Sequence, residues 1–255
     1  LSPRPMPRRL YTPTLPAPGA TLGLPESEAA HAVRVLRARV GDEFVLLDGQ
    51  GGRATVTVTS FGQGRRPELF CTCQTRDAAP RPRLAPCLFL APPRANLVGP
   101  LLRQMTELGV HTIAPVICER SVSKPDARAV AGWEADTLEA MKQSGNAYLP
   151  RLLPPRPLGE ALAGFRGLLL AGTVPLANHE PAGTWASALR AQLAASPSEP
   201  VSVGLAIGPE GGFSPKEDEL LARAGARAVT LGPWILRVET AAVAALACLW
   251  TVSAS

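Results

Sequence analysis

Short apolar runs and alternating apolar and polar positions dominate the first third of the chain. Residues 43–47 form a compact apolar run, and residues 53–59 and 69–73 alternate as strands with one buried face do. Glycines within residues 48–52 predict a tight turn between the first two strands. A short helix capped by Ser27 is expected before them. Strands at this spacing predict a small β-barrel.

The pattern changes after residues 78–83, a proline- and arginine-rich stretch typical of a linker. Beyond it, strands are expected at 84–91, 111–118, 167–172, 201–208 and 228–231, and helices at 97–108, 126–144, 185–194, 214–224 and 238–252. Ser214 opens one of these helices with a capping box. Apolar strands that alternate with helices predict an α/β fold whose parallel sheet is covered on both faces. We therefore expect two domains, a β-barrel over residues 1–80 and an α/β domain over residues 84–255.

Composition excludes several classes of protein. Of the 255 residues, 46% are hydrophobic and 18% are charged, which is enough apolar material for a sizeable core. No apolar stretch approaches the roughly 20 residues of a membrane span, so no membrane association is expected. The first residues lack the apolar core of a signal peptide, which favours a cytoplasmic location. The five cysteines match no zinc motif, and we expect no metal site.

The net charge of +5 lies entirely in residues 1–83, which hold 12 arginines, no lysine and seven acidic residues. A basic module beside a neutral one favours an acidic partner such as nucleic acid. A face formed by Arg8, Arg9, Arg34 and Arg37 would bind phosphates. The alternative is that these arginines only solubilise the surface of an arginine-rich protein.

Two segments at predicted strand ends are candidates for a ligand site. Residues 207–214 read Ile-Gly-Pro-Glu-Gly-Gly-Phe-Ser, and their glycines let a ligand approach the backbone closely. In residues 231–240 a Gly-Pro pair and an apolar loop precede Arg237 and a helix start. Because ligands bind beyond the carboxyl ends of parallel strands, each segment is a candidate ligand-binding loop. An ordinary strand-to-helix connection is the alternative for each.

These segments and several others resemble the RsmE family of SPOUT-class RNA methyltransferases. The resemblance is carried by Arg9-Leu10-Tyr11, His31, Val35-Leu36-Arg37, Gly41-Asp42, Asp48-Gly49, Thr106-Glu107-Leu108-Gly109-Val110, Glu119-Arg120-Ser121, Gln143-Ser144-Gly145, residues 207–214 and residues 235–241. It implies a PUA-like RNA-binding β-barrel followed by an α/β SPOUT domain with a trefoil knot. It also implies a homodimer that uses S-adenosylmethionine to methylate N3 of a uridine in 16S ribosomal RNA, within the 30S subunit.

The resemblance further implies which residues form the sites. Those expected to bind the cofactor are Gly172, Thr173, Ile207, Gly208, Pro209, Glu210, Gly211, Gly212, Leu231, Gly232, Ile235, Leu236 and Thr240. Glu210 is the candidate base or orienting group for the uracil N3 proton, with a purely structural role as a cap as the alternative, and Arg237 would stabilise the uracil oxygens. Arg94 is expected to join the arginines of the first domain in binding RNA.

The chain departs from the family pattern at charged positions. Trp234 and Asn146 replace arginines, Lys142 replaces a glutamate and Gln104 replaces a lysine, whereas Arg94 replaces a lysine with like charge. Because the cofactor loops rely on backbone and glycines, we expect cofactor binding to survive these changes. The departures leave two alternatives open, a SPOUT enzyme with another RNA target and an inactive RNA-binding or ribosome-assembly protein.

Overall fold

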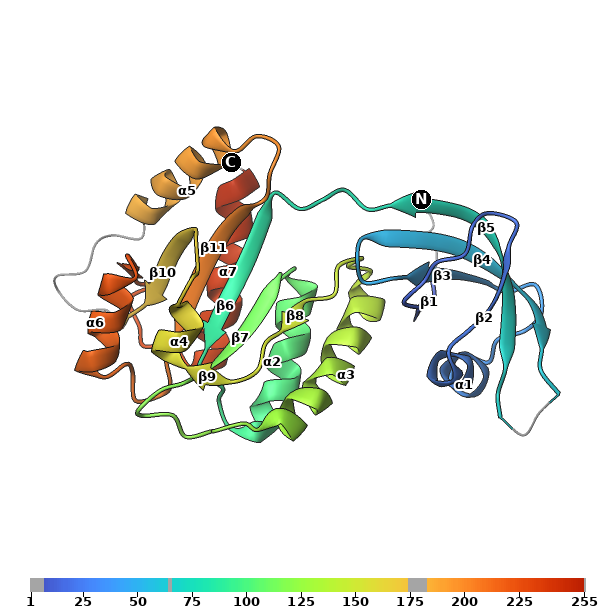
Figure 1. Cartoon of the computed structure of the whole chain (residues 1–255), viewed down its shortest axis with the longest axis horizontal. Coiled ribbons are helices and arrows are strands. Elements are labelled where there is room, and N and C mark those ends of the chain that lie inside the picture. The colour runs from blue at the N-terminus through green and yellow to red at the C-terminus, as the bar shows by residue number, and fades with distance from the viewer. Residues whose placement is uncertain (1–6, 64–65, 174–182, 255) are drawn as a thin grey trace. The chain divides into compact units, whose positions relative to one another are not determined.

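The computed structural model describes residues 7–63, 66–173 and 183–254, and it divides the chain into two compact units (Figure 1). The first unit comprises residues 1–80 together with Met141–Leu149. The second comprises Arg81–Ala140 and Pro150–Ser255. The division after Pro80 lies within the linker stretch, but the short segment 141–149 belongs with the first unit although it is distant in sequence.

The first unit contains one five-stranded sheet with the order β1-β3-β4-β5-β2. Its strands are β1 (Arg9–Tyr11), β2 (Thr21–Gly23), β3 (Glu43–Leu47), β4 (Gly52–Phe61) and β5 (Leu69–Ala78). Only β1 and β3 pair in parallel, and the other neighbours are antiparallel. Within the described residues the short edge strands β1 and β2 do not pair with each other, so the expected barrel is not closed by backbone hydrogen bonds.

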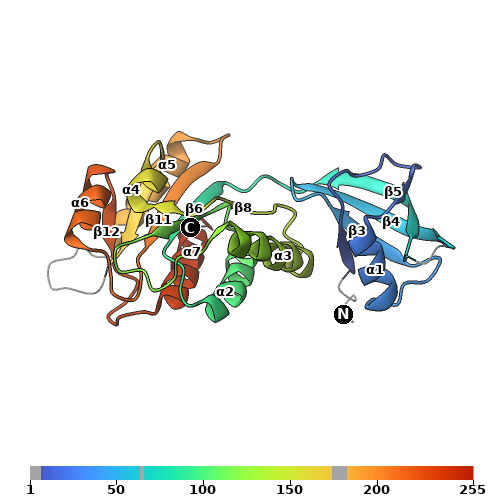
Figure 2. The ribbon, with the colours of Figure 1, turned by 60° about the horizontal axis from the view of Figure 1, so that its bottom comes forward.

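Helix α1 (Glu26–Arg34) packs its small residues onto this sheet (Figure 2). Ala29 and Ala32 are fully buried in the same cluster as the inward-facing residues of β3, β4 and β5. The prediction of Ser27 as the N-cap is wrong: the helix begins at Glu26 after Pro25, whose φ of −51° and ψ of 143° end the preceding extended segment. Glu26 and Glu28 occupy the first turn, where negative charge complements the helix dipole.

Cys71 and Cys73 face the core from β5, as their alternation predicts. Both are buried, and burial raises the pKa of Cys71 to about 11, so that thiol stays protonated at neutral pH. Throughout the described ranges, no group of three His, Cys, Asp or Glu residues is placed to hold a metal ion.

The turn predicted at residues 48–52 connects β3 to β4. Asp48 Oδ1 accepts hydrogen bonds from the Gln50 and Gly52 amides at 2.7 and 2.8 Å. Gly49 and Gly51 have φ values of 72° and 100°, which other residues rarely adopt. The backbone of this turn also bonds the segment 141–149: the Gly51 amide donates to the Ala147 carbonyl, and the Leu149 amide donates to the Gly49 carbonyl, both at 2.9 Å.

A buried ion pair gives the same segment a second attachment. Lys142 Nζ lies 3.0 Å from Glu28 Oε1, and the two side chains are only 9% and 5% exposed. The other carboxylate oxygen, Glu28 Oε2, accepts a hydrogen bond from the Tyr11 amide at 3.2 Å. Arg9 reaches the same region and donates to the carbonyls of Lys142 and Gln143 at 3.2 and 2.9 Å. The first unit is therefore completed by residues that follow it by more than sixty positions in the sequence.

The second unit is built on a parallel sheet with the order β12-β10-β11-β6-β7-β8, and β9 pairs with β7. Its strands are β6 (Leu84–Leu90), β7 (Thr112–Ile117), β8 (Arg151–Leu152), β9 (Arg156–Pro157), β10 (Leu168–Gly172), β11 (Val201–Ile207) and β12 (Arg227–Val229). Its helices are α2 (Ala95–Glu107), α3 (Ala127–Ser144), α4 (Leu158–Leu162), α5 (Gly183–Ala195), α6 (Pro215–Arg223) and α7 (Val238–Ala254). All strand pairs are parallel, as predicted.

Helices cover both faces of this sheet (Figure 1). One apolar cluster joins α2, α5 and α7 to the sheet, and a second joins α4 and α6 to the opposite face. The short elements β8, β9 and α4 were not predicted, because two to five residues carry too little periodicity to be recognised. In the described parts of the chain, no helix combines the length and apolar character needed to cross a bilayer. The knot implied by the family resemblance stays a prediction.

The buried pair yields a stability prediction. Lys142→Met would leave the Glu28 carboxylate buried without its cation, which costs about 3–5 kcal/mol of unfolding free energy. Asp77→Asn is the matched control in the same unit, because the Arg53–Asp77 pair is exposed and such pairs contribute about 0–1 kcal/mol. Both tyrosines lie in the first unit and all four tryptophans in the second, so urea unfolding followed by tyrosine signals isolates the first unit. A tyrosine transition that moves no further than the control's would contradict the prediction.

Candidate functional site

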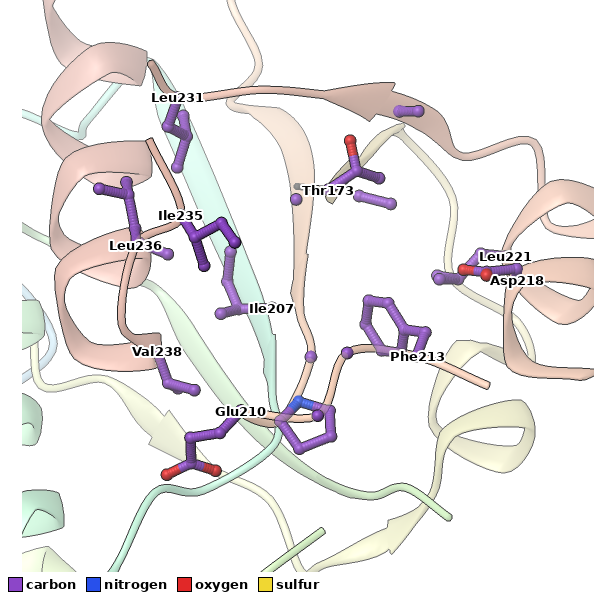
Figure 3. A pocket seen from close by; sticks show the side chains of 18 of the residues that line it. Thr173, Ile207, Glu210, Phe213, Asp218, Leu221, Leu231, Ile235, Leu236 and Val238 are labelled. Carbon is purple, nitrogen blue, oxygen red and sulfur yellow. The ribbon is translucent and has the colours of Figure 1, made fainter. Parts of the chain in front are cut away.

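A single edge of the parallel sheet carries the candidate site. Because β10, β11 and β12 are parallel, the segments that follow them emerge at the same edge. There they surround a cavity of about 810 Å³, a size typical of small-molecule sites. Figure 3 shows Ile207 and a row of apolar side chains on one side, with Thr173, Phe213 and Asp218 across from them; the row consists of Leu231, Ile235, Leu236 and Val238.

Most of the predicted cofactor-binding residues line this cavity. They are Gly172, Thr173, Ile207, Gly208, Pro209, Glu210, Gly211, Gly212, Leu231, Ile235 and Leu236, and the predicted catalytic Arg237 lines it too. Gly232 and Thr240 do not line it. Helix α7 directs Val238 and Ala241, three residues apart, toward the cavity, which turns Thr240 to another face. Gly232 lies in the turn after Leu231 with a φ of 150°.

The glycine-rich loop is a tight turn. The Gly212 amide donates to the Pro209 carbonyl at 2.8 Å, and Gly212 has a φ of 71°, which favours glycine. A Cβ atom on Gly208 would lie 3.2 Å from the Phe213 ring, closer than ordinary contact. The glycines therefore allow both the turn and the close packing of Phe213 beside the cavity.

The end of β10 is tied to β12 at the other side of the cavity. The Thr173 amide donates to the Val229 carbonyl at 2.9 Å, and its hydroxyl donates to the same oxygen at 3.3 Å. The backbone groups of this strand end thus have a fixed position. The strand expected at 228–231 is β12, which covers Arg227–Val229 in the structure. Leu231 therefore lies beyond the strand and lines the cavity.

An apolar loop forms the second wall. Leu231, Ile235 and Leu236 line the cavity, and Ile207 faces them from β11 (Figure 3). Trp234 and Ile235 are 77% and 78% exposed, the largest exposures among the large apolar side chains described. Such a wall suits a flat apolar group of a ligand. The side chains of Trp234 and Ile235 form apolar surface that nothing in the described chain covers.

Glu210 and Arg237 offer one carboxylate and one guanidinium to the cavity. Both side chains are exposed, and none of the residues described forms a hydrogen bond or ion pair with either charged group. Figure 3 shows the Glu210 carboxylate pointing below Val238, at the lower end of the cavity. A free carboxylate can accept a proton, and a guanidinium, which stays protonated, can stabilise a negative oxygen. A structural cap would accept a hydrogen bond from a backbone amide, and the Glu210 carboxylate accepts none from the residues described.

The cavity also contains Arg120, which the sequence did not predict as a site residue. It follows β7, and its Nη1 donates to the carbonyls of Gly211 and Phe213 at 2.9 and 3.2 Å. Cys118 precedes it and is buried; burial and the nearby Glu217 carboxylate raise the pKa of this thiol to about 12. Cys118 is therefore protonated at neutral pH and is no candidate nucleophile. Asp218 was also missed, as were Ala222, Ala226 and Ala228, whereas Phe213 lies within the predicted segment 207–214.

The predicted RNA-binding arginines of the first unit divide into two kinds. Arg8 bonds Asp42 at 2.8 Å and the Leu36 carbonyl at 3.1 Å, and it lies 4.6 Å from the Phe44 ring centroid. Its hydrogen bond holds the pKa of Asp42 below the usual value. Arg9 bonds the carbonyls of Lys142 and Gln143, as described above. Both residues therefore have structural roles.

The other arginines are free. Arg34, in the last turn of α1, and Arg37 are exposed, and no side chain or carbonyl in the described chain binds their guanidinium groups. Arg37 has a φ of 52°, the one positive value among the non-glycine residues described. Arg94 is exposed at the N-cap of α2, in the second unit.

Two family comparisons match these two units. The family described as RNA methyltransferase domain matches residues 80–250. The family described as RNA methyltransferase PUA domain matches residues 24–63, within the first unit. The two matches together extend over most of both units.

Individual relatives carry the likeness through nearly the whole chain. Ribosomal RNA small subunit methyltransferase E of Mycobacterium bovis is 32% identical over 255 residues, covering 96% of this chain and 94% of the relative. The protein of the same name from Synechocystis is 32% identical over 231 residues, covering 89% of this chain and 72% of the relative. A crystal structure of ribosomal RNA small subunit methyltransferase E from Neisseria gonorrhoeae bound to S-adenosyl methionine is 28% identical. It superposes with a TM-score of 0.82 and covers 96% of this chain and 98% of that chain.

Proposed function

The chain belongs to the ribosomal RNA small subunit methyltransferase E family, and we propose that it transfers the methyl group of S-adenosylmethionine to N3 of a uridine in 16S ribosomal RNA. The observation that carries the proposal is the cavity at the carboxyl ends of β10, β11 and β12, in a chain whose relative was crystallised with this cofactor. The first unit, with its PUA-family match, would hold the RNA.

The residues of the cavity fit the cofactor. Backbone groups at the ends of β10 and β11 suit hydrogen bonds to a ribose or a base edge, and Leu231 and Leu236 suit the flat face of an adenine. The glycines of residues 208–212 let a ligand approach the main chain. S-adenosylmethionine supplies an electrophilic methyl group. The chain has to align the acceptor nitrogen with that group.

The acceptor nitrogen sets the remaining chemistry. Uracil N3 carries a proton and can attack only as that proton leaves. We propose that the unpaired carboxylate of Glu210 accepts the proton or orients N3. The guanidinium of Arg237 would bind a uracil oxygen and stabilise the negative charge that develops there. Trp234, which stands where the family has an arginine, removes a second cation from this loop.

The direct test is methylation of purified 30S subunits that lack the modification, with mass analysis of the nucleosides released from their RNA. The expected product is 3-methyluridine. Another methylated nucleoside would indicate an enzyme with a different RNA target. A chain that binds RNA but shows no heat of binding with S-adenosylmethionine would be an RNA-binding or assembly protein instead. Retention of activity on naked 16S RNA would show that the intact 30S subunit is not required.

Glu210→Gln tests the proton acceptor. Removing a general base costs typically 10²- to 10⁴-fold in rate, so kcat should fall within this range while the calorimetric affinity for the cofactor stays nearly constant. Asp218→Asn is the matched control, because Asp218 lines the same cavity from α6 and has no proposed role in the proton transfer. Equal rates for Glu210→Gln and the parental enzyme would refute the assignment.

RNA binding by the first unit is proposed to depend on Arg34 and Arg37, which are free, rather than on Arg8 and Arg9, which are engaged. Each phosphate contact contributes roughly 0.7–0.9 to the slope of log K against log salt. The Arg34→Gln/Arg37→Gln variant should therefore flatten that slope by about 1.4–1.8 when both residues bind phosphates. The control Arg190→Gln/Arg223→Gln removes the same charge from exposed positions of α5 and α6. Identical slopes for the two variants would exclude a phosphate-binding role for this face.

We also propose that the enzyme is a cytoplasmic homodimer. Helix α7 leaves Ala247 and Cys248 exposed, and the adjacent loop exposes Trp234 and Ile235, so apolar surface of one subunit is available to another. Light scattering at micromolar concentration should give the mass of a dimer, and Cys248→Glu should shift it toward the monomer. Val35→Glu places the same charge on an exposed apolar residue of the first unit and should leave the dimer intact. A parental monomer would contradict the proposal.

A further inference from the structure

The turn that follows β7 contacts the glycine-rich loop at several points. Cys118 and Ser121 close this turn: the Cys118 amide donates to Ser121 Oγ at 2.9 Å, and the Ser121 amide donates to the Cys118 carbonyl at 3.1 Å. Two residues between them, Glu119 and Arg120, reach the chain that follows β11. The turn is therefore internally fixed and can act as a rigid support.

Arg120 binds the glycine-rich loop from the turn that follows β7. Its Nη1 donates to the carbonyls of Gly211 and Phe213, which flank Gly212. Its aliphatic stem also covers Gly211, since a Cβ atom there would lie 3.3 Å from Arg120 Cβ and 3.4 Å from Cδ. One side chain thus fixes the orientation of two peptide groups in a loop that glycine would otherwise leave mobile.

Glu217 connects the same two segments from the buried side. Its side chain is 7% exposed, and each carboxylate oxygen accepts one backbone amide. Oε2 accepts from Ser214 at 2.8 Å, which completes the capping box of α6, and Oε1 accepts from Glu119 at 2.8 Å. The capping residue of α6 therefore also holds the turn after β7.

We propose that Arg120 and Glu217 are positioning residues that together hold the loop 208–213 in its cofactor-binding shape, an inference that rests on the proposed function. Arg120 fixes the loop carbonyls, and Glu217 fixes the turn that carries Arg120 relative to the start of α6. Neither residue needs to touch the reacting atoms. Their effect reaches the cofactor through the backbone of the glycine-rich loop.

The first readout is independent of the cofactor. Hydrogen exchange of the peptide that contains residues 208–213 should be faster in Arg120→Met, because methionine keeps much of the stem and loses every donor. Arg83→Met is the matched control: Arg83 donates to the carbonyls of Leu193, Ser196 and Pro197 in the same unit and does not line the cavity. Unchanged loop exchange in Arg120→Met would overturn the proposal whether or not the chain is a methyltransferase.

The second readout is cofactor affinity. In Arg120→Met, the calorimetric Kd for S-adenosylmethionine should rise roughly tenfold to hundredfold, because hydrogen bonds from a charged group are lost. KM for the cofactor should rise in parallel while kcat at saturation stays within about twofold. This pattern is expected when binding is weakened equally in the ground state and in the transition state. Arg120→Lys keeps the charge but lacks the planar fork, so it should recover only part of the affinity. An effect confined to kcat, or to KM for RNA, would instead indicate direct contact with the substrate and overturn a positioning role.

Glu217→Gln tests the second half of the pair. A glutamine offers one acceptor oxygen and one amide group, so one of the two backbone amides loses its partner. Loop exchange and Kd should both rise, and the double variant with Arg120→Met should raise Kd by less than the product of the two single effects, because both act on one loop. Fully multiplicative effects would show two independent contributions and contradict a shared mechanism. Absence of cofactor binding in the parental chain would count against the proposed function alone.

Discussion

The parallel pairing of β10 with its two neighbours, β11 and β12, is the constraint on which the site depends. The register aligns Leu170 with Leu205 and Gly172 with Val229, so the three strands end close together at one edge. Segments that lie far apart in the sequence, at 171–173, 207–213 and 231–238, then have to meet around a single cavity. The apolar clusters on both faces fix the sheet and leave this edge as the place where backbone and polar groups remain available.

Much of this arrangement could be predicted from local patterns. The apolar strands, the capping box at Ser214 and the glycine-rich loop each carry a signal within a few residues, and the structure confirms these elements. The role of Arg120 could not be predicted in the same way, because it depends on β7 lying two strands away from β11 in the sheet. Thr240 lies within a predicted segment but faces away from the cavity, since a helix turns successive residues by about 100°.

The first unit shows a similar limit of sequence reasoning. Its strands are local, but Lys142, Ala147 and Leu149 complete it from beyond α2 and β7. Lys142 is buried against Glu28, and this carboxylate gives a physical reason for a cation at this position. A glutamate there would place two carboxylates together in a buried site, which is unfavourable. The partner of Glu28 lies in α3, so no property of residues 1–80 alone could reveal this ion pair.

In the first unit, an arginine that adds to the net positive charge does not always have a guanidinium that is free to bind a ligand. Arg8 and Arg53 are paired with Asp42 and Asp77, so part of the positive charge of the first unit is compensated locally. Arg9 binds only carbonyl oxygens in the described structure, and these neutral acceptors leave its charge uncompensated. In the proposed RNA-binding role, such a residue would add to the field that attracts RNA from a distance, although its Nη1 group already donates to two carbonyls. The proposed direct contacts need free donors, as in Arg34 and Arg37 at the end of α1, whereas the charge that would attract RNA is spread over the whole unit.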